Sequence, residues 1–127
     1  MDAIATVVSE DSVAAPFSGK RAAVVVVEAL RGDEVIGTTV FGDLLRLRAE
    51  TGEVEVVARR ATFAFTSMFD APPAPEHVPA ELVPMLQRGA TAFRERLIRR
   101  GDRLHVRRRD DDPSGRVQLD ELLAFET

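Results

Sequence analysis

The sequence predicts a mainly β domain of the α+β type, either a bent antiparallel sheet or a partly open barrel, with one amphipathic helix near the C-terminus. Three observations support this prediction. Most segments are short, rich in β-branched residues and separated by turns that contain Gly or Pro. One segment alternates apolar and charged residues on both sides of a tight turn. Only one stretch repeats apolar residues at helical spacing.

The expected strands begin at the N-terminus and are joined by short turns. The run "RAAVVVVEAL" is continuously apolar, as in a strand that is buried on both faces or crosses a barrel. Gly37 predicts a bulge or a sharp bend in its strand. Within the hairpin, Val54, Val56 and Ala58 share one face, while Glu53 and Glu55 share the other. The strands are expected at 3–9, 21–30, 34–41, 43–60 (a hairpin), 61–69, 102–109 and 116–126.

The helix is expected over residues 79–99, after a Pro-rich segment at 70–82 that cannot form a strand or helix interior. Pro79 suits a first helical turn, and Gly101 suits the left-handed residue that follows a helix. One apolar stripe supports this interpretation: Leu82, Leu86, Gly89/Ala90, Phe93 and Leu97.

Composition restricts the class of protein. The 127 residues are enough for a single domain, 1–127, and 45% of them are hydrophobic. There are no cysteines, which excludes disulfides and thiolate chemistry, and the net charge of −4 argues against a chain that coats nucleic acid over its whole surface. The start has no signal-peptide pattern, and the longest apolar run, 22–27, is too short to cross a bilayer. We therefore expect a soluble, cytoplasmic protein without membrane insertion.

Several motifs invite functional interpretations that turns explain better. Both RGD tripeptides, at 31–33 and 100–102, fit turns that the fold needs, and adhesion is the weaker hypothesis. The "DDDPSG" run lacks the spaced ligands of a calcium loop, and the two histidines are too few and too far apart for a zinc site. Ser67, Asp70 and His77 contain the residue types of a hydrolase triad, but no nucleophile elbow surrounds them. No catalytic residue, metal or cofactor is predicted.

Arginines dominate one region of the chain. Nine arginines and two acidic residues lie between positions 88 and 109, and Arg103, His105, Arg107 and Arg109 share one face of the expected strand at 102–109. This face could hold an anionic or protein partner, or nucleic acid in an OB-like barrel, although it lacks aromatic residues on which bases stack. The favoured interpretation is a solvated face, paired across strands with Glu53, Glu55 and the "DDD" run.

A second candidate surface is aromatic. Phe65, Met68 and Phe69 lie beside the Pro-rich segment and would form an apolar patch for a partner if they were exposed. We favour the alternative, in which the phenylalanines fill the core.

The order of motifs resembles the GIDE domain, a β-rich module found beside membranes in MULAN-type E3 ubiquitin ligases and in many bacterial proteins. The resemblance covers residues 13–110. It rests on a "PFSG" turn, a "TGEVEV" hairpin and a "RERLIRRGD" turn into a strand, and the matching positions are Pro16, Ser18, Gly19, Thr51, Gly52, Val54, Val56, Glu95, Leu97 or Ile98, Gly101, Asp102 and Val106. The family's aromatic strand after the first turn is replaced by "AAVVVV", and its RING finger and transmembrane helices are absent here.

The resemblance implies a non-enzymatic binding or scaffold module that acts through protein–protein contacts or self-association. The alternative is an OB-like domain that binds nucleic acid or another polyanion through Arg103, Arg107 and Arg109. A hydrolase is the least supported class.

Overall fold

The computed structural model describes residues 2–65, 69–71, 78–108 and 117–121. It is mainly β, with a curled half-barrel sheet and one short α-helix, which confirms the predicted fold class. The strands are β1 (Asp2–Val7), β2 (Val13–Ala14), β3 (Arg21–Ala22), β4 (Val24–Arg31), β5 (Glu34–Phe41), β6 (Leu44–Ala49), β7 (Gly52–Val57), β8 (Thr62–Ala64), β9 (Phe69–Ala71), β10 (Ala92–Ile98), β11 (Arg103–Arg108) and β12 (Val117–Glu121). The helical elements are the 3-10 turns η1 (Ala58–Arg60) and η3 (Ala80–Leu82) and the helix α1 (Val83–Gln87).

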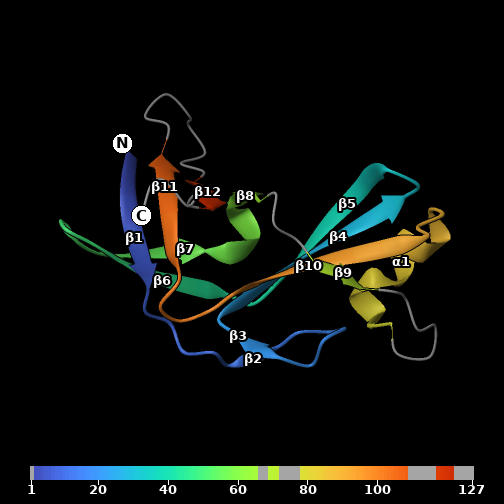
Figure 1. Ribbon diagram of the computed structural model, residues 1–127, viewed down its shortest axis with the longest axis horizontal. Helices are drawn as coiled ribbons and strands as arrows, with labels where there is room; N and C mark the ends of the chain where they lie inside the picture. Colours follow the sequence, from blue (N-terminus) through green and yellow to red (C-terminus); the bar gives the residue numbers. More distant parts are fainter. Residues whose placement is uncertain (1, 66–68, 72–77, 109–116, 122–127) are drawn as a thin grey trace.

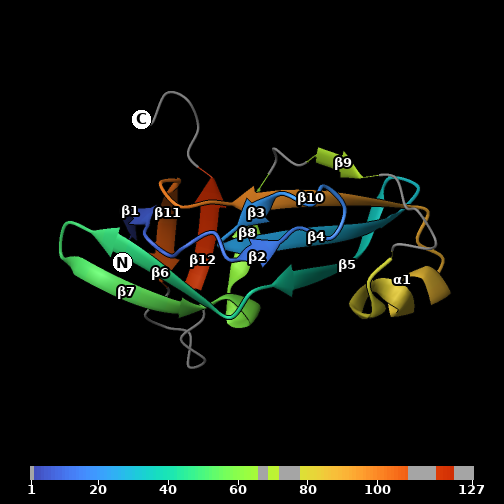
Figure 2. The same cartoon turned by 90° about the horizontal axis from the view of Figure 1, so that it is seen from below.

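The strands form two main sheets that lie side by side (Figure 1). The six-stranded sheet has the order β7-β6-β1-β11-β12-β8, and the four-stranded sheet has the order β5-β4-β10-β9. All neighbours are antiparallel except β12 and β8, which are parallel. The small β2–β3 sheet crosses in front of β4, and α1 lies at the end of the molecule farthest from the β6–β7 hairpin (Figure 2).

Strand β4 joins two hydrophobic cores, because its side chains alternate between the faces of its sheet. Val24 and Val26 pack with the inner face of the half-barrel, whereas Val25 and Val27 pack beneath the β2–β3 sheet and the helical segment. All four are almost fully buried. The continuous valine run therefore is a strand buried on both faces, as the sequence predicts.

The structure also confirms the bend at Gly37. The register between β4 and β5 shifts after Ala29, which pairs with Gly37, so that Leu30 pairs with Val35 and leaves Ile36 as the extra residue. A Cβ on Gly37 would lie 2.5 Å from the terminal carbon of Met85, so glycine here also makes room for the segment that follows η3.

The predicted helix over 79–99 is wrong in extent. Helical structure ends at Gln87, and Gly89, with a φ of 94°, turns the chain into strand β10. Phe93, placed on the predicted helical stripe, is instead a fully buried strand residue. Gly101 does have the positive φ expected of it, 93°, but it lies in the turn between β10 and β11 rather than after a helix.

Candidate partner-binding surface

Strand β11 has the alternation that the sequence predicts. Leu104 is buried in the core, while Arg103, His105 and Arg107 lie on the opposite, outer face of the sheet. Arg107 is not an open cation, because its Nε lies 2.8 Å from Oδ2 of Asp120 on β12. In the backbone register, Arg107 is paired with Asp2 of β1.

The remaining pairs on this outer face belong to the β6–β7 hairpin. Arg46 pairs with Glu55 at 3.2 Å, and Arg48 pairs with Glu53 at 2.9 Å. The sequence-based expectation that Glu53 and Glu55 pair with the arginines of β11 is therefore wrong. Both glutamates pair with β6, because β6 and β1 lie between β7 and β11. We use "outer face" below for the sheet surface that carries these charges: Arg46, Arg48, Glu53, Glu55, Arg103, His105, Arg107 and Asp120.

Of the predicted aromatic patch, the structure describes the side chain of Phe65. Phe65 is half-buried and packs beside Phe63 against the core on the inner face of the half-barrel, with the two ring centroids 5.9 Å apart. The guanidinium of Arg96 lies 5.2 Å from the centroid of the Phe65 ring. This supports the interpretation in which the aromatic residues fill the core.

Some candidates lie outside the described residues. These are Met68 and Arg109, together with Ser67, His77 and the "DDD" run, while Phe69 is described only as a backbone position of β9.

Both RGD tripeptides lie at turns. Gly32, with a φ of 63°, turns β4 into β5, and Arg31 forms an exposed ion pair with Glu34. At the second tripeptide, Gly101 donates its N–H to Val7 O at 2.8 Å, and the backbone N–H of Arg99 bonds the carboxylate of Asp102 at 2.8 Å. The turn interpretation is confirmed at both positions.

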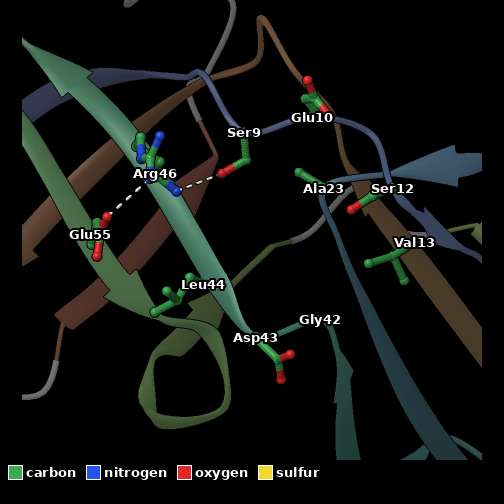
Figure 3. Close-up of a pocket in the computed structure, with 10 residues that line it drawn as sticks. All are labelled: Ser9, Glu10, Ser12, Val13, Ala23, Gly42, Asp43, Leu44, Arg46 and Glu55. Carbon is green, nitrogen blue, oxygen red and sulfur yellow. Dashed lines mark hydrogen bonds and ion pairs between the residues drawn. The ribbon is translucent and has the colours of Figure 1, made fainter.

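An open polar cleft of about 360 Å³ lies where the two sheets meet (Figure 3). The residues that line it come from the segment after β1, from the residue before β4, from the link between β5 and β6, and from the β6–β7 hairpin: Ser9, Glu10, Ser12, Val13, Ala23, Gly42, Asp43, Leu44, Arg46 and Glu55. The Ser9 hydroxyl accepts a hydrogen bond from the Arg46 backbone N–H at 2.7 Å, which ties the segment after β1 to β6. Sequence reasoning missed this cleft, because its walls come from positions far apart in the chain.

The cleft is acidic. Glu10 and Asp43 lie on opposite sides of it, and Glu55 closes a third side (Figure 3). Among the described residues, neither the Glu10 carboxylate nor the Asp43 carboxylate has a hydrogen-bond or ion-pair partner, whereas the one guanidinium in the lining, that of Arg46, is already paired with Glu55. Such a site can receive a cationic group, since an ammonium or guanidinium would find carboxylates without a competing protein cation.

A buried carboxylate ties the four-stranded sheet to the turn before β3. Glu95 on β10 is 3% exposed, and its two oxygens accept backbone N–H bonds from Phe17 at 3.3 Å and Ser18 at 3.1 Å. The Phe17 ring stacks on Phe93, two residues before Glu95, at a centroid distance of 5.2 Å. Glu95 therefore has a structural role, because its carboxylate accepts hydrogen bonds from two backbone N–H groups of this turn.

Searches among protein-family models, curated proteins and solved structures find no match to this chain. Within the described part of the chain, no helix has the length and apolar character needed to cross a membrane. Nor do the described ranges contain a group of three or more His, Cys, Asp or Glu residues placed to hold a metal ion.

Proposed function

We propose that this protein is a non-enzymatic binding module that recognises a basic segment of a partner protein. The observation that carries the proposal is the acidic cleft at the junction of the two sheets. Its unpartnered carboxylates, Glu10 and Asp43, are accessible from solvent, and its single arginine is neutralised by Glu55. A partner with Arg or Lys side chains would supply the missing positive charges.

The chemistry of the cleft supports binding over catalysis. Ser9 contributes its hydroxyl as an acceptor for a backbone N–H, and none of the described residues that line the cleft is a histidine. The histidine in the described ranges, His105, lies on β11 opposite Ile4 of the outer face. Ser9 therefore lacks the histidine base that most often activates a serine nucleophile.

The same proposal includes the likeness to the GIDE domain and a cytoplasmic location. One contact supports the likeness, because the Glu95 carboxylate binds the backbone of the "PFSG" turn at Phe17 and Ser18. Two motifs that are far apart in the sequence therefore meet in space, as motifs that define one fold would.

Binding of a polyanion through the outer face is less well supported. Arg46, Arg48 and Arg107 each pair with a carboxylate, so positive and negative side chains alternate across the sheet. Among the described arginines of β11, Arg103 is the exposed cation for which no ion pair is found. A phosphate backbone needs a stripe of available cations, which this pattern does not supply.

A pair of probes tests the proposal. An oligoarginine peptide should bind the protein, with affinity that falls as salt rises, and oligothymidylate should not bind. The cleft variant Glu10→Lys/Asp43→Lys should weaken peptide binding about tenfold or more. The control Asp33→Lys/Glu34→Lys, which changes the net charge equally at the exposed β4–β5 turn, should not. Equal losses in both variants would refute a specific site. Oligothymidylate binding that Arg103→Glu/Arg107→Glu abolishes would establish the polyanion alternative instead.

A further inference from the structure

Strand β7 lies at one end of the six-stranded sheet, and the described residues include no strand that pairs with its outer side. The ladder between β6 and β7 extends to a hydrogen bond from the Ala58 N–H to Asp43 O at 2.8 Å, which identifies the bonded rows. Because bonded and non-bonded pairs alternate in an antiparallel ladder, the backbone N–H and C=O groups of Glu53, Glu55 and Val57 point away from β6. These groups form a pairing edge.

This edge has few of the features that protect exposed strands. Its register with β6 is unbroken, and residues 52–57 contain no proline or lysine. The β5 edge of the four-stranded sheet differs: β5 is bulged near Gly37, and both Met85 and η1 contact it. The contrast indicates that β7, at the rim of the half-barrel (Figure 2), is more open to pairing than β5.

The side chains of β7 specify what could pair there. On the outer face, Glu53 and Glu55 each use one carboxylate oxygen, Oε1, for the ion pair with β6, and each carboxylate is about half exposed. On the inner face, Val54 is 39% exposed and borders a small apolar hollow of about 60 Å³. The rest of this hollow is lined by Ala3, Ala5, Leu47, Ala49, Thr51, Val106 and Val117.

Strand β6 shows the pattern that complements β7. It places Arg46 and Arg48 opposite the two glutamates and buries Leu45 and Leu47 on the inner face. A strand added to the free side of β7 would lie beside the same two rows of side chains as β6 does, the glutamates on the outer face and the valines on the inner face. It would therefore need the same alternation as β6. Basic residues should therefore alternate with small apolar residues in the added strand.

A second copy of this chain does not meet that requirement. Two β7 strands related by a two-fold axis would pair antiparallel with their faces preserved, which sets Glu53 and Glu55 of one copy beside those of the other. Like charges directly opposite one another destabilise a pair of strands. The carboxylates on β7 therefore oppose self-pairing while favouring a basic partner.

We propose that the free edge of β7 accepts an extended, basic segment of a partner protein as an added strand. Arg or Lys of this segment would face Glu53 and Glu55, and small apolar side chains would enter the hollow beside Val54. This inference rests on the proposed function and deepens it. It names the strand edge that binds the partner and the alternation of side chains that the partner segment needs. The cleft adjoins this edge through Glu55, so a longer partner segment would contact both.

The test uses a hexapeptide of alternating arginine and valine, followed by amide chemical shifts and by fluorescence anisotropy of a labelled peptide. The control peptide has the same composition in two blocks, three arginines and then three valines. We expect the alternating peptide to bind about tenfold more tightly and to shift the amides of Glu53, Glu55 and Val57, because only it presents one charged and one apolar face.

Backbone methylation separates strand pairing from simple charge attraction. In an antiparallel addition, the N–H groups of the arginines point to β7, so methylating these nitrogens should abolish binding, whereas methylating the valine nitrogens should not. A parallel addition reverses this result. Either one-sided loss supports the proposal, and equal binding of the two methylated peptides would overturn it.

Charge reversal provides a matched control in the protein. Glu53→Lys/Glu55→Lys should lose the arginine–valine peptide and gain binding of a glutamate–valine peptide, a rescue that a misfolded variant would not show. The variant Asp33→Lys/Glu34→Lys should keep the original preference. Shifts confined to the cleft around Ser9 and Asp43 would overturn the edge proposal and leave the proposed function standing, while a failure of every basic peptide to bind would remove both.

Discussion

The Glu95 carboxylate offers the sharpest test of the energetics of this fold. It is buried, and it accepts two backbone hydrogen bonds from the turn at 17–18, more than seventy residues away in the chain. A hydrogen bond to a charged group contributes about 1.5–3 kcal/mol. Ser18 is exposed, so water can replace the carboxylate as the partner of its N–H. Glu95→Ala should therefore lower the free energy of unfolding by about 3 kcal/mol, less than the roughly 6 kcal/mol that two hydrogen bonds at the upper limit would contribute.

The conservative variant gives an intermediate result. Glu95→Gln keeps one carbonyl acceptor but sets an amide N–H₂ against the second backbone N–H, so it should cost about 1–2 kcal/mol. Urea titrations would measure both changes, and in thermal melts each kcal/mol corresponds to about 3–5 °C in Tm. Glu50→Gln, in the exposed β6–β7 turn, is the control and should leave stability unchanged. A loss below about 1 kcal/mol for Glu95→Ala would refute the structural role assigned to this carboxylate.

Three other substitutions follow from burial and backbone geometry. Leu45→Ala should cost about 3–5 kcal/mol in urea unfolding, since Leu45 is fully buried, whereas Leu44→Ala, at a 52% exposed neighbour, should cost under about 1 kcal/mol. Gly42→Ala should destabilise more than Gly32→Ala, because both have positive φ but only at Gly42 would a Cβ lie 3.1 Å from a backbone oxygen. Arg107→Ala should change stability by less than about 1 kcal/mol, because the Arg107 side chain is half exposed and the Asp120 carboxylate keeps its hydrogen bond from the Gln118 side chain.

Each of these expectations has an outcome that contradicts it. Similar losses for Leu45→Ala and Leu44→Ala would mean that β6 does not alternate between core and solvent. Equal effects of Gly42→Ala and Gly32→Ala would show that the close approach to the chain at Ala23 is absent. A loss above about 2 kcal/mol for Arg107→Ala would indicate that the outer face of β11 is buried rather than exposed.

Strands with a clear alternation or a tight turn could be predicted from the sequence. The predicted range 34–41 matches β5, and the predicted hairpin at 43–60 contains β6 and β7 in the expected order. Local chemistry suffices for such elements, because the turn determines the register and the alternation determines the faces.

The extent of the helix could not be predicted by the same logic. Phe93 and Leu97 are four residues apart, a spacing that places side chains on one face of a helix and equally on one face of a strand. The residue between them, Glu95, is charged, yet it is buried by a turn distant in the sequence. In the structure, Gly89 and Gly101 have positive φ angles and form the turns on either side of β10, but eleven residues between two glycines fit a helix as well as a strand.

The candidate site depended on tertiary structure even more strongly. The exposure of Arg103 and Arg107 follows from the alternation in β11, but their counter-charges do not, because strand order decides which strand faces which. The cleft between Glu10 and Asp43 forms where two sheets meet, and no local pattern marks such a junction.

The strand order also has a consequence for the timing of folding. β1 lies between β6 and β11, so Thr6 must pair with Arg103, about three quarters of the chain away, before the half-barrel can close. Ribosomes add about 5–20 residues per second, so β1 waits roughly 5–20 s for its partner during synthesis. The β6–β7 hairpin needs only adjacent residues and can form in microseconds. The strand with the free edge thus becomes structured early, while the sheet that supports it is completed last.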